Sequence, residues 1–227
     1  MDFDAFDALT FDCYGTLIDW ETGILAALRA VTSDHDDEAL LAAFARHEAD
    51  LEAGPYLRYR DVLRGCLKAL GEELGFATTD AQLDAFGGSV ADWPAFDDSP
   101  AALAKLQTRF KLGVITNCDD DLFAASNARL GVELDWVVTA EQARGYKPRT
   151  ENFEFAFARM DVPRERVLHV AQSLFHDHVP AKALGLTTVW IDRRQGRAGT
   201  GATPPAEATP DLTTPDLATF AALAVRT

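Results

Sequence analysis

Five polar residues that could take part in catalysis follow four apolar runs of the sequence. Asp12 comes directly after the first run, and Thr116 and Asn117 lie where the second one ends. Lys147 follows the third run and Asp177 follows the fourth. If these runs are parallel strands, their carboxyl ends lie at one edge of a sheet, where the five side chains would meet in one cleft. A lysine beside Asp12 there would hold the carboxylate ionised, as a nucleophile requires.

Each of these residues also has a simpler interpretation when it is considered alone. An aspartate after a strand, such as Asp12 or Asp177, commonly forms a turn or starts a helix, and Thr116 and Asn117 could cap the next helix. A single lysine such as Lys147 is usually a surface residue. The catalytic interpretation therefore depends on the four positions taken together.

The elements that would position these residues are short apolar runs alternating with helical stretches. The predicted buried strands are 8–11, 112–116, 136–139, 167–171 and 188–191. Stretches with apolar residues at three- and four-residue intervals, 99–110, 120–131 and 150–160, predict helices between the later strands. This alternation is typical of an α/β fold with a doubly wound parallel sheet.

One interval, residues 18–95, breaks the alternation, because it is helical in character throughout. We interpret it as a helical domain inserted into an α/β core formed by residues 1–17 and 96–227, and expect it to cover the carboxyl ends of the strands. Residues 193–210, rich in Gly, Pro, Ala and Thr, predict a loop. A short helix is expected over 215–225.

Composition limits the partners and the cellular compartment. The formal net charge of the 227 residues is −15, from 36 acidic and 21 basic residues, so nucleic acid is excluded as a partner. Three cysteines with no metal-ligand spacing predict reduced thiols in a cytoplasmic protein. No positively charged start resembles a secretion signal, and no apolar run is long enough for a membrane span. We therefore expect a soluble protein with no membrane partner.

Four segments in order, "FDCYGTL", "VITNCDD", "YKP" and "QSLFHDHVPAKALG", resemble the four motifs of the haloacid dehalogenase (HAD) superfamily. The resemblance covers nearly the whole chain, including an insertion placed like the helical cap of that superfamily. It implies a hydrolase with a Rossmann-like core. Because of "DCYGTLIDW", the chain is most similar to the L-2-haloacid dehalogenase branch.

Two positions favour this branch over the magnesium-dependent phosphatases of the superfamily. Tyr14 stands where those phosphatases carry an aspartate that protonates the leaving alcohol. An alkoxide needs that proton, whereas a halide leaves without one. Gln172 stands where they carry an acidic metal ligand, and a neutral amide is a weak ligand for Mg²⁺. The resemblance thus implies no metal and no cofactor, with Mg²⁺ needed only if the chain is a phosphatase.

The resemblance also implies roles for the residues of the cleft. Asp12 would displace halide from a short 2-haloalkanoic acid, and water would hydrolyse the resulting ester to a 2-hydroxy acid. Lys147 would keep Asp12 anionic, and Asp177 would orient Lys147 and help to position water. Thr116 and Asn117 would hydrogen-bond the substrate carboxylate or Asp12.

Further substrate contacts are expected from residues around this cleft. Arg46, in the inserted segment, resembles the arginine through which relatives receive the departing halide. Tyr14, Gln172 and Ser173 are also predicted to contact the substrate. Three positions depart from the dehalogenase pattern: Gln172, Leu174 and Phe153. His176 and His178 flank Asp177, and we expect them to be solvated or helix-capping side chains rather than metal ligands.

Two other functions remain open at this point. One is a Mg²⁺-dependent phosphatase of a small metabolite, in which Asp12 is transiently phosphorylated. The other is a non-catalytic relic that binds a carboxylate ligand or a protein partner. Relatives are often dimers, so the resemblance makes a homodimer a candidate assembly.

Overall fold

The computed structural model of this chain, which describes residues 1–196 and 201–225, contains one parallel sheet of six strands. The strand order is β3-β2-β1-β4-β5-β6, as in a doubly wound sheet. The strands are β1 (Ala8–Phe11), β2 (Lys111–Thr116), β3 (Trp136–Thr139), β4 (Val167–Ala171), β5 (Thr187–Ile191) and β6 (Leu212–Thr214). The five predicted strands are confirmed. Their short, continuously apolar runs are typical of strands that are buried on both faces of a parallel sheet.

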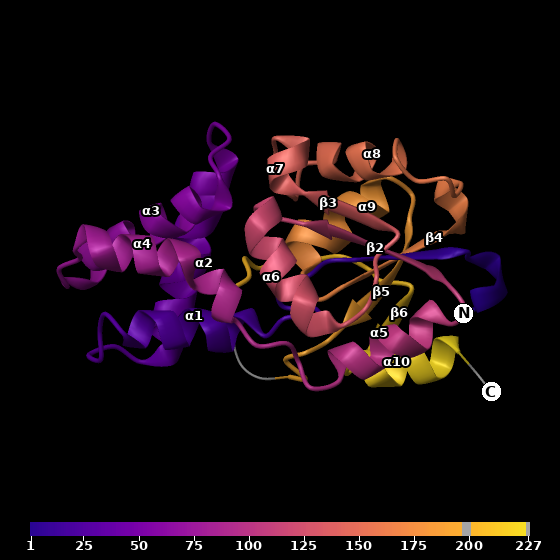
Figure 1. Cartoon of the computed structure of the whole chain (residues 1–227), viewed down its shortest axis with the longest axis horizontal. Helices are drawn as coiled ribbons and strands as arrows, with labels where there is room; N and C mark the ends of the chain where they lie inside the picture. Colours follow the sequence, from indigo (N-terminus) through magenta and orange to yellow (C-terminus); the bar gives the residue numbers. More distant parts are fainter. Residues whose placement is uncertain (197–200, 226–227) are drawn as a thin grey trace.

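Helices cover both faces of this sheet (Figure 1). One face packs against α5 (Ser99–Gln107), α6 (Asp120–Leu130) and α10 (Leu217–Ala224). The other packs against α8 (Glu151–Phe157) and α9 (Val179–Ala183). Short elements complete the core: η1 (Phe3–Ala5), α7 (Ala140–Ala143), η3 (Arg164–Arg166) and the π-helix η4 (Leu174–His178). The predicted α/β fold is therefore observed.

Between β1 and β2 the chain forms a group of helices at one end of the molecule, opposite the N-terminus (Figure 1). They are α1 (Trp20–Arg29), α2 (Asp37–Ala53), α3 (Tyr59–Leu74), α4 (Asp80–Gly88) and the 3₁₀ helix η2 (Ser89–Asp92). The two connections to the sheet meet at Ile18, which forms isolated bridges with Tyr14 and Ala95.

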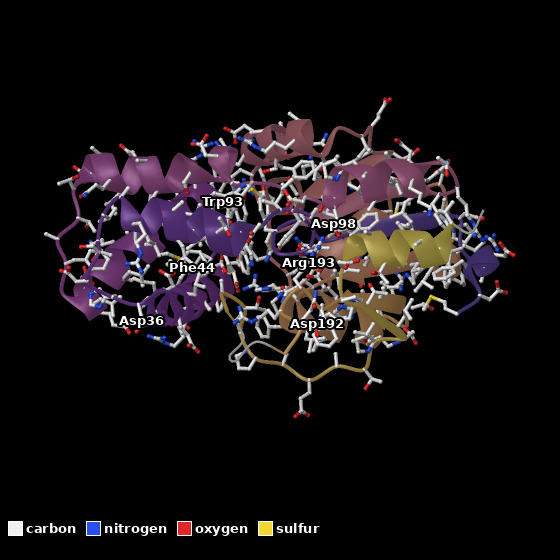
Figure 2. The ribbon with its side chains drawn as sticks, turned by 90° about the horizontal axis from the view of Figure 1, so that it is seen from below. Asp36, Phe44, Trp93, Asp98, Asp192 and Arg193 are labelled. Carbon is white, nitrogen blue, oxygen red and sulfur yellow. The ribbon has the colours of Figure 1, made fainter. Side chains whose placement is uncertain are left out.

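The helical segment has its own buried aromatic residues, among them Phe44 and Trp93 (Figure 2). Phe44 lies between Trp20 and Phe86 in edge-to-face contacts. Gly23 in α1 lies directly against the ring of Trp93, and a side chain at this position would collide with it. This close approach fixes α1 against the return connection to the core.

A partly buried ion pair joins the loop after β5 to the start of α5. Arg193 donates to both carboxylate oxygens of Asp98 at 2.9 and 3.0 Å, and to the carbonyl of Thr16 at 2.8 Å (Figure 2). Asp98 also accepts the backbone N–H of Leu217 at the start of α10. These contacts tie the C-terminal part of the core to the turn that follows β1.

The predicted loop 193–210 contains residues 197–200, which lie outside the described residues, as do residues 226–227 of the predicted core. The predicted C-terminal helix is observed as α10. Within the described residues, each helix is too short or too polar to cross a membrane. The three cysteines are buried free thiols.

Candidate active site at the carboxyl edge of the sheet

Asp12 follows β1 and is held by a tight turn. Gly15 has φ +90°, and a Cβ at this position would lie 2.9 Å from Trp20 Nε1, so only glycine fits the turn. Thr16 Oγ1 donates to Asp12 Oδ2 at 2.8 Å and accepts from the backbone N–H of Gln172 at 2.9 Å. The turn therefore presents the Asp12 carboxylate and supplies one of its hydrogen bonds.

Lys147 lies beside Asp12 and is 1% exposed. Its Nζ donates to Asp12 Oδ1 at 2.8 Å, to Asp177 Oδ1 at 2.7 Å and to the carbonyl of Ile115 at 2.8 Å. Burial acts to lower the pKa of Lys147, but the two carboxylates outweigh it and raise that pKa above the usual value. The ammonium is therefore charged, with all three of its N–H groups bonded.

The two carboxylates beside Lys147 differ in their surroundings. Burial raises the pKa of Asp12, although Lys147 and Thr16 oppose this effect. For Asp177 the effect of burial is outweighed by Lys147 and by His169, whose Nε2 lies 3.0 Å from Asp177 Oδ1, and the pKa is lowered. Asp177 is therefore ionised and holds Lys147 in place, and Asp12 is the more basic of the two carboxylates.

Thr116 is the last residue of β2 and Asn117 follows it, as predicted, but the two side chains make different contacts. Asn117 Oδ1 accepts the backbone N–H of Lys147 at 2.8 Å, and its Nδ2 donates to the carbonyl of Lys147 at 2.9 Å. It therefore fixes the backbone from which the ammonium extends. Thr116 Oγ1 is buried and has no hydrogen-bond partner among the described residues. The predicted threonine hydrogen bond to Asp12 comes from Thr16 instead.

The structure does not bring Arg46 to this cleft. Its guanidinium is 56% exposed and pairs with Glu73. In α2, residue 46 lies about 200° around the helix from Glu48, which faces Asp12, so Arg46 points the other way. The prediction that Arg46 lies at the halide position was wrong.

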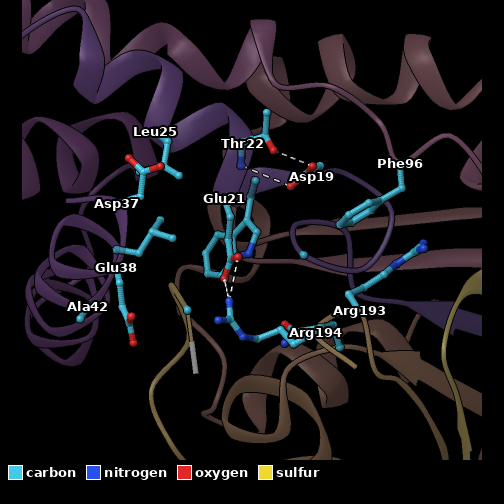
Figure 3. Close-up of a pocket in the computed structure, with 15 residues that line it drawn as sticks. Asp19, Glu21, Thr22, Leu25, Asp37, Glu38, Ala42, Phe96, Arg193 and Arg194 are labelled. Atoms are coloured by element: carbon cyan, nitrogen blue, oxygen red, sulfur yellow. Dashed lines mark hydrogen bonds and ion pairs between the residues drawn. The ribbon is translucent and has the colours of Figure 1, made fainter. Parts of the chain in front are cut away.

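Gln172 also lies outside the Asp12 cavity. Its side chain lines a separate cavity of about 470 Å³ between α1, α2 and the loop after β5 (Figure 3). The lining of this cavity contains both charged and apolar side chains, among them Glu21 and Arg194, which form an ion pair at 2.8 Å. Trp20 lines both cavities and separates them. The predicted contact of Gln172 with a substrate at Asp12 is therefore not supported.

The cavity at Asp12 has a volume of about 30 Å³. The predicted residues Tyr14, Asn117, Lys147, Ser173 and Asp177 contribute to its lining. Trp20 and His176 also line it, and so do three residues that were not predicted from the sequence: Glu48, Glu52 and Tyr59.

Tyr14 forms part of the wall as predicted, but its hydroxyl is turned away toward α6. The hydroxyl lies 3.1 Å from Ser126 Oγ, and the ring packs edge-to-face on Trp93. Burial raises the pKa of Tyr14 well above its usual value. Tyr14 is therefore a neutral part of the wall.

Two acids of α2, Glu48 and Glu52, are buried in the lining. Tyr59 Oη donates to Glu48 Oε1 at 2.7 Å, and Asn117 Nδ2 donates to Glu52 Oε2 at 3.1 Å. Burial raises the pKa of Glu48 to about 8, and burial together with the neighbouring Glu48 raises that of Glu52 well above its usual value. Both carboxyl groups are therefore protonated at neutral pH.

The histidines beside Asp177 are buried rather than solvated, which contradicts the prediction. Ser173 Oγ accepts the backbone N–H of His176 at 2.9 Å and lies 3.2 Å from its Nδ1. Burial lowers the pKa of both His176 and His178 to about 4, so both rings are neutral at pH 7. His178 contacts the carbonyl of Ala171, and His176 faces the cavity.

The donor set at this site fits a magnesium ion poorly. The Lys147 ammonium lies between Asp12 and Asp177 and bonds both. The side chain of Gln172 faces the other cavity. Among residues 1–196 and 201–225, no three or more His, Cys, Asp or Glu side chains converge as a metal site would require.

Comparison with known proteins identifies related sequences and folds. A family model described as haloacid dehalogenase-like hydrolase matches residues 6–184. The (S)-2-haloacid dehalogenase H-109 of Pseudomonas putida is 24% identical over 196 residues, 83% of this chain and 86% of its own. The 5-amino-6-(5-phospho-D-ribitylamino)uracil phosphatase YigB of Escherichia coli is 28% identical over 207 residues, 83% and 84% of the two chains. The structure of L-2-haloacid dehalogenase from Xanthobacter autotrophicus, with chloropropionic acid covalently bound, has a TM-score of 0.81 at 22% identity, covering 96% and 98%.

Proposed function

The chain belongs to the haloacid dehalogenase-like hydrolases, and from this premise we propose that it hydrolyses short 2-haloalkanoic acids to 2-hydroxy acids. The observation that carries the proposal is the buried contact of Lys147 Nζ with Asp12 Oδ1, 2.8 Å, and with Asp177 Oδ1, 2.7 Å, which pairs both carboxylates with an ammonium group rather than leaving them for a metal ion. The (S)-2-haloacid dehalogenases among the relatives support the same reaction class.

In the first step, a carboxylate oxygen of Asp12 attacks the carbon that bears the halogen. A carbon–oxygen bond forms, and the carbon–halogen bond breaks with its electron pair leaving on the halide. Lys147 and Thr16 hold Asp12 in place, and the positive charge keeps it ionised despite burial. The raised pKa of Asp12 makes it a better nucleophile than an ordinary aspartate, provided that it is deprotonated.

In the second step, water adds to the carbonyl carbon of the Asp12 ester. The resulting oxyanion develops beside Lys147 and Thr16, which are already placed to donate to the two oxygens of Asp12. Collapse breaks the bond between the acyl carbon and the substrate oxygen, which takes up a proton as the 2-hydroxy acid leaves. The overall reaction consumes one water and releases one halide and one proton.

Tyr14 bears on the identity of the leaving group, because it stands at the position where a phosphatase of the superfamily carries its general acid. The Tyr14 hydroxyl lies toward Ser126 with a raised pKa, so it does not serve as an acid for a departing alkoxide. A halide needs no such acid. The Asp12, Lys147 and Asp177 arrangement therefore suits displacement at carbon.

The test is to incubate the protein with 2-chloropropionate in excess EDTA and measure free halide. We expect halide release that is lost in Asp12→Asn. Absence of halide together with Mg²⁺-dependent release of phosphate from phosphate monoesters would replace this proposal with a phosphatase. If neither halide nor phosphate is released, but a carboxylate ligand raises the Tm, the protein would be a non-catalytic binding protein.

A phosphatase is the second candidate, because the Escherichia coli relative is a phosphatase at 28% identity. One feature of the site favours it: Asp177 Oδ2 is buried without a hydrogen-bond partner among the described residues, as an oxygen reserved for another ligand would be. The poor fit of the remaining donors to Mg²⁺ ranks it below dehalogenation.

A further inference from the structure

A carboxylate substrate would be repelled by the net negative charge of this cavity. Among the described residues, 1–196 and 201–225, no arginine lines it, and all three N–H groups of Lys147 already have acceptors. The ionised groups, Asp12, Lys147 and Asp177, sum to a charge of −1. A bound anion would therefore need hydrogen-bond donors that bring no further negative charge.

We infer that Glu48, Glu52 and His176 form a receptor for the substrate anion that is built from neutral hydrogen-bond donors. This inference rests on the proposed function, because it takes a carboxylate as the ligand. It gives two acids of α2 a role that was predicted for Thr116 and Asn117, namely hydrogen bonding to the substrate carboxylate.

The hydrogen bonds of the two carboxyl groups leave one oxygen of each group for the cavity. Glu48 uses Oε1 to accept from Tyr59, and Glu52 uses Oε2 to accept from Asn117. A carboxylic acid carries its proton on one oxygen, and the oxygen that accepts from a protein donor is the poorer place for it. The proton therefore belongs on the other oxygen of each group, from which it can be donated to a ligand.

His176 supplies the third donor through its tautomer. Ser173 Oγ already accepts the backbone N–H of His176, so its own proton is available for Nδ1, 3.2 Å away. A neutral imidazole that accepts at Nδ1 carries its proton on Nε2. Nε2 is buried without a hydrogen-bond partner among the described residues and lies 3.9 Å from Glu52 Oε2. That distance is too long for a direct hydrogen bond, and an anion oxygen that accepts from Nε2 would satisfy it.

The receptor works only while the two glutamic acids are protonated. Burial raises the pKa of Glu48 to about 8 and that of Glu52 well above its usual value. Below pH 8 Glu48 is a donor, whereas above it the carboxylate repels an anion. Other titratable groups facing the pair are Tyr14, Tyr59, Cys66, Tyr146, Asp12, Lys147, His176 and Asp177. We expect none of them to change charge between pH 7 and 8.5, because each is either held charged by a buried partner or kept neutral by burial.

Propionate, an unreactive carboxylate, is the probe, and its Kd is measured by calorimetry between pH 6 and 9. For the wild-type protein we expect a constant Kd up to about pH 8 and a rise approaching tenfold per pH unit above it. Glu48→Gln keeps a neutral donor at this position, so the rise near pH 8 should disappear while the Kd at pH 7 changes less than about threefold. Asp50→Asn removes a charge from the exposed side of the same helix and should match the wild type. The Tm of each variant reports folding.

Two results would overturn the receptor. One is a propionate Kd that is independent of pH or absent throughout. The other is tighter binding of propylammonium than of propionate that strengthens as the pH rises, which would mean that ionised glutamates bind a cation. Halide release from 2-chloropropionate, measured on the same samples, separates the two proposals. Release with a flat propionate Kd rejects the receptor alone, whereas pH-dependent propionate binding without release rejects dehalogenation alone.

Discussion

At the scale of single residues, Lys147 controls the charge of the cleft. Its ammonium bonds Asp12 and Asp177 simultaneously, and it is fully buried with them. Removing one member of such a set leaves uncompensated charge where water cannot solvate it.

We predict that Lys147→Ala lowers kcat at pH 7 by at least about 100-fold, because the two carboxylates would then share a proton and the oxyanion would lose its cation. The measurement is kcat as a function of pH, and the acidic limb of the profile should move to higher pH as the pKa of Asp12 rises further. Lys68→Ala, on the exposed side of α3, is the control and should leave both quantities unchanged. Near-normal turnover of Lys147→Ala would show that Lys147 has no part in catalysis.

Which of these residues could be predicted from the sequence depends on the secondary structure that carries them. Asp12, Lys147 and Asp177 follow strands, and the ends of parallel strands meet at one edge, so their proximity could be predicted. Glu48 and Arg46 lie on a helix, where a shift of two residues changes the face completely. The signal that could have found Glu48 was its apolar face, because it shares a stripe with residues 41, 44 and 45.

At the scale of elements, α3 is held to the core through its first turn. The helix has no side-chain cap of its own. Instead Asp119, after β2, accepts the backbone N–H groups of Tyr59 at 2.8 Å and Arg60 at 3.1 Å. A residue of the core therefore caps a helix of the inserted segment and sets the position of Tyr59, which in turn holds Glu48.

We expect Asp119→Ala to lower the free energy of unfolding by about 1–3 kcal/mol, because two buried N–H groups lose their acceptor. Urea denaturation measures this change. Asp121→Ala is the matched control: its carboxylate is 62% exposed and also pairs with arginines of α3, yet its loss should cost less than about 0.5 kcal/mol. Equal losses in the two variants would show that surface ion pairs, not the cap, hold α3.

The first residue of α1 has a different task, because Trp20 separates the 30 Å³ cavity at Asp12 from the 470 Å³ cavity beside it. A space of 30 Å³ holds about one water, so a larger substrate needs the wall to move.

Trp20→Phe should therefore raise the preference for 2-chlorobutanoate over 2-chloropropionate, expressed as the ratio of kcat/KM values, by about tenfold, the effect of one methylene group. Trp136→Phe in β3, away from both cavities, serves as the control. An unchanged ratio would mean that Trp20 does not limit substrate length.

At the scale of the whole molecule, the sheet was more predictable than its edges. Central strands such as β1 and β4 are buried along their whole length and read as continuous apolar runs. The edge strand β6 has three residues, of which only Thr214 is buried, so no periodicity could mark it. The packing of the inserted helices against the strand ends depends on contacts such as Asp119 with α3, which no local pattern contains.

The buried acids and histidines make the stability of the whole chain depend on pH in a defined direction. In the unfolded chain the histidines titrate near pH 6.5 and the glutamic acids near 4.5. In the folded chain burial lowers the pKa of His176 and His178 to about 4, raises that of Glu48 to about 8 and raises that of Glu52 well above its usual value. Between pH 4.5 and 6.5 the unfolded chain binds two protons on its histidines, and the folded chain binds two protons on its glutamic acids. The two states therefore bind equal numbers of protons at these groups, and the free energy of unfolding changes little with pH in this interval.

Between pH 6.5 and 8 only the folded state still binds these two protons, so the free energy of unfolding should fall as the pH rises. For two protons the slope approaches about 3 kcal/mol per pH unit, and we expect a loss of roughly 2–4 kcal/mol across this interval. Urea denaturation at pH 5.5, 6.5 and 8 measures it. Glu48→Gln should halve the slope, because its amide does not titrate, whereas Asp50→Asn should preserve it. A free energy of unfolding that is constant from pH 6.5 to 8 would mean that Glu48 and Glu52 are ionised in the folded protein, and the neutral donors inferred for the cavity would not exist.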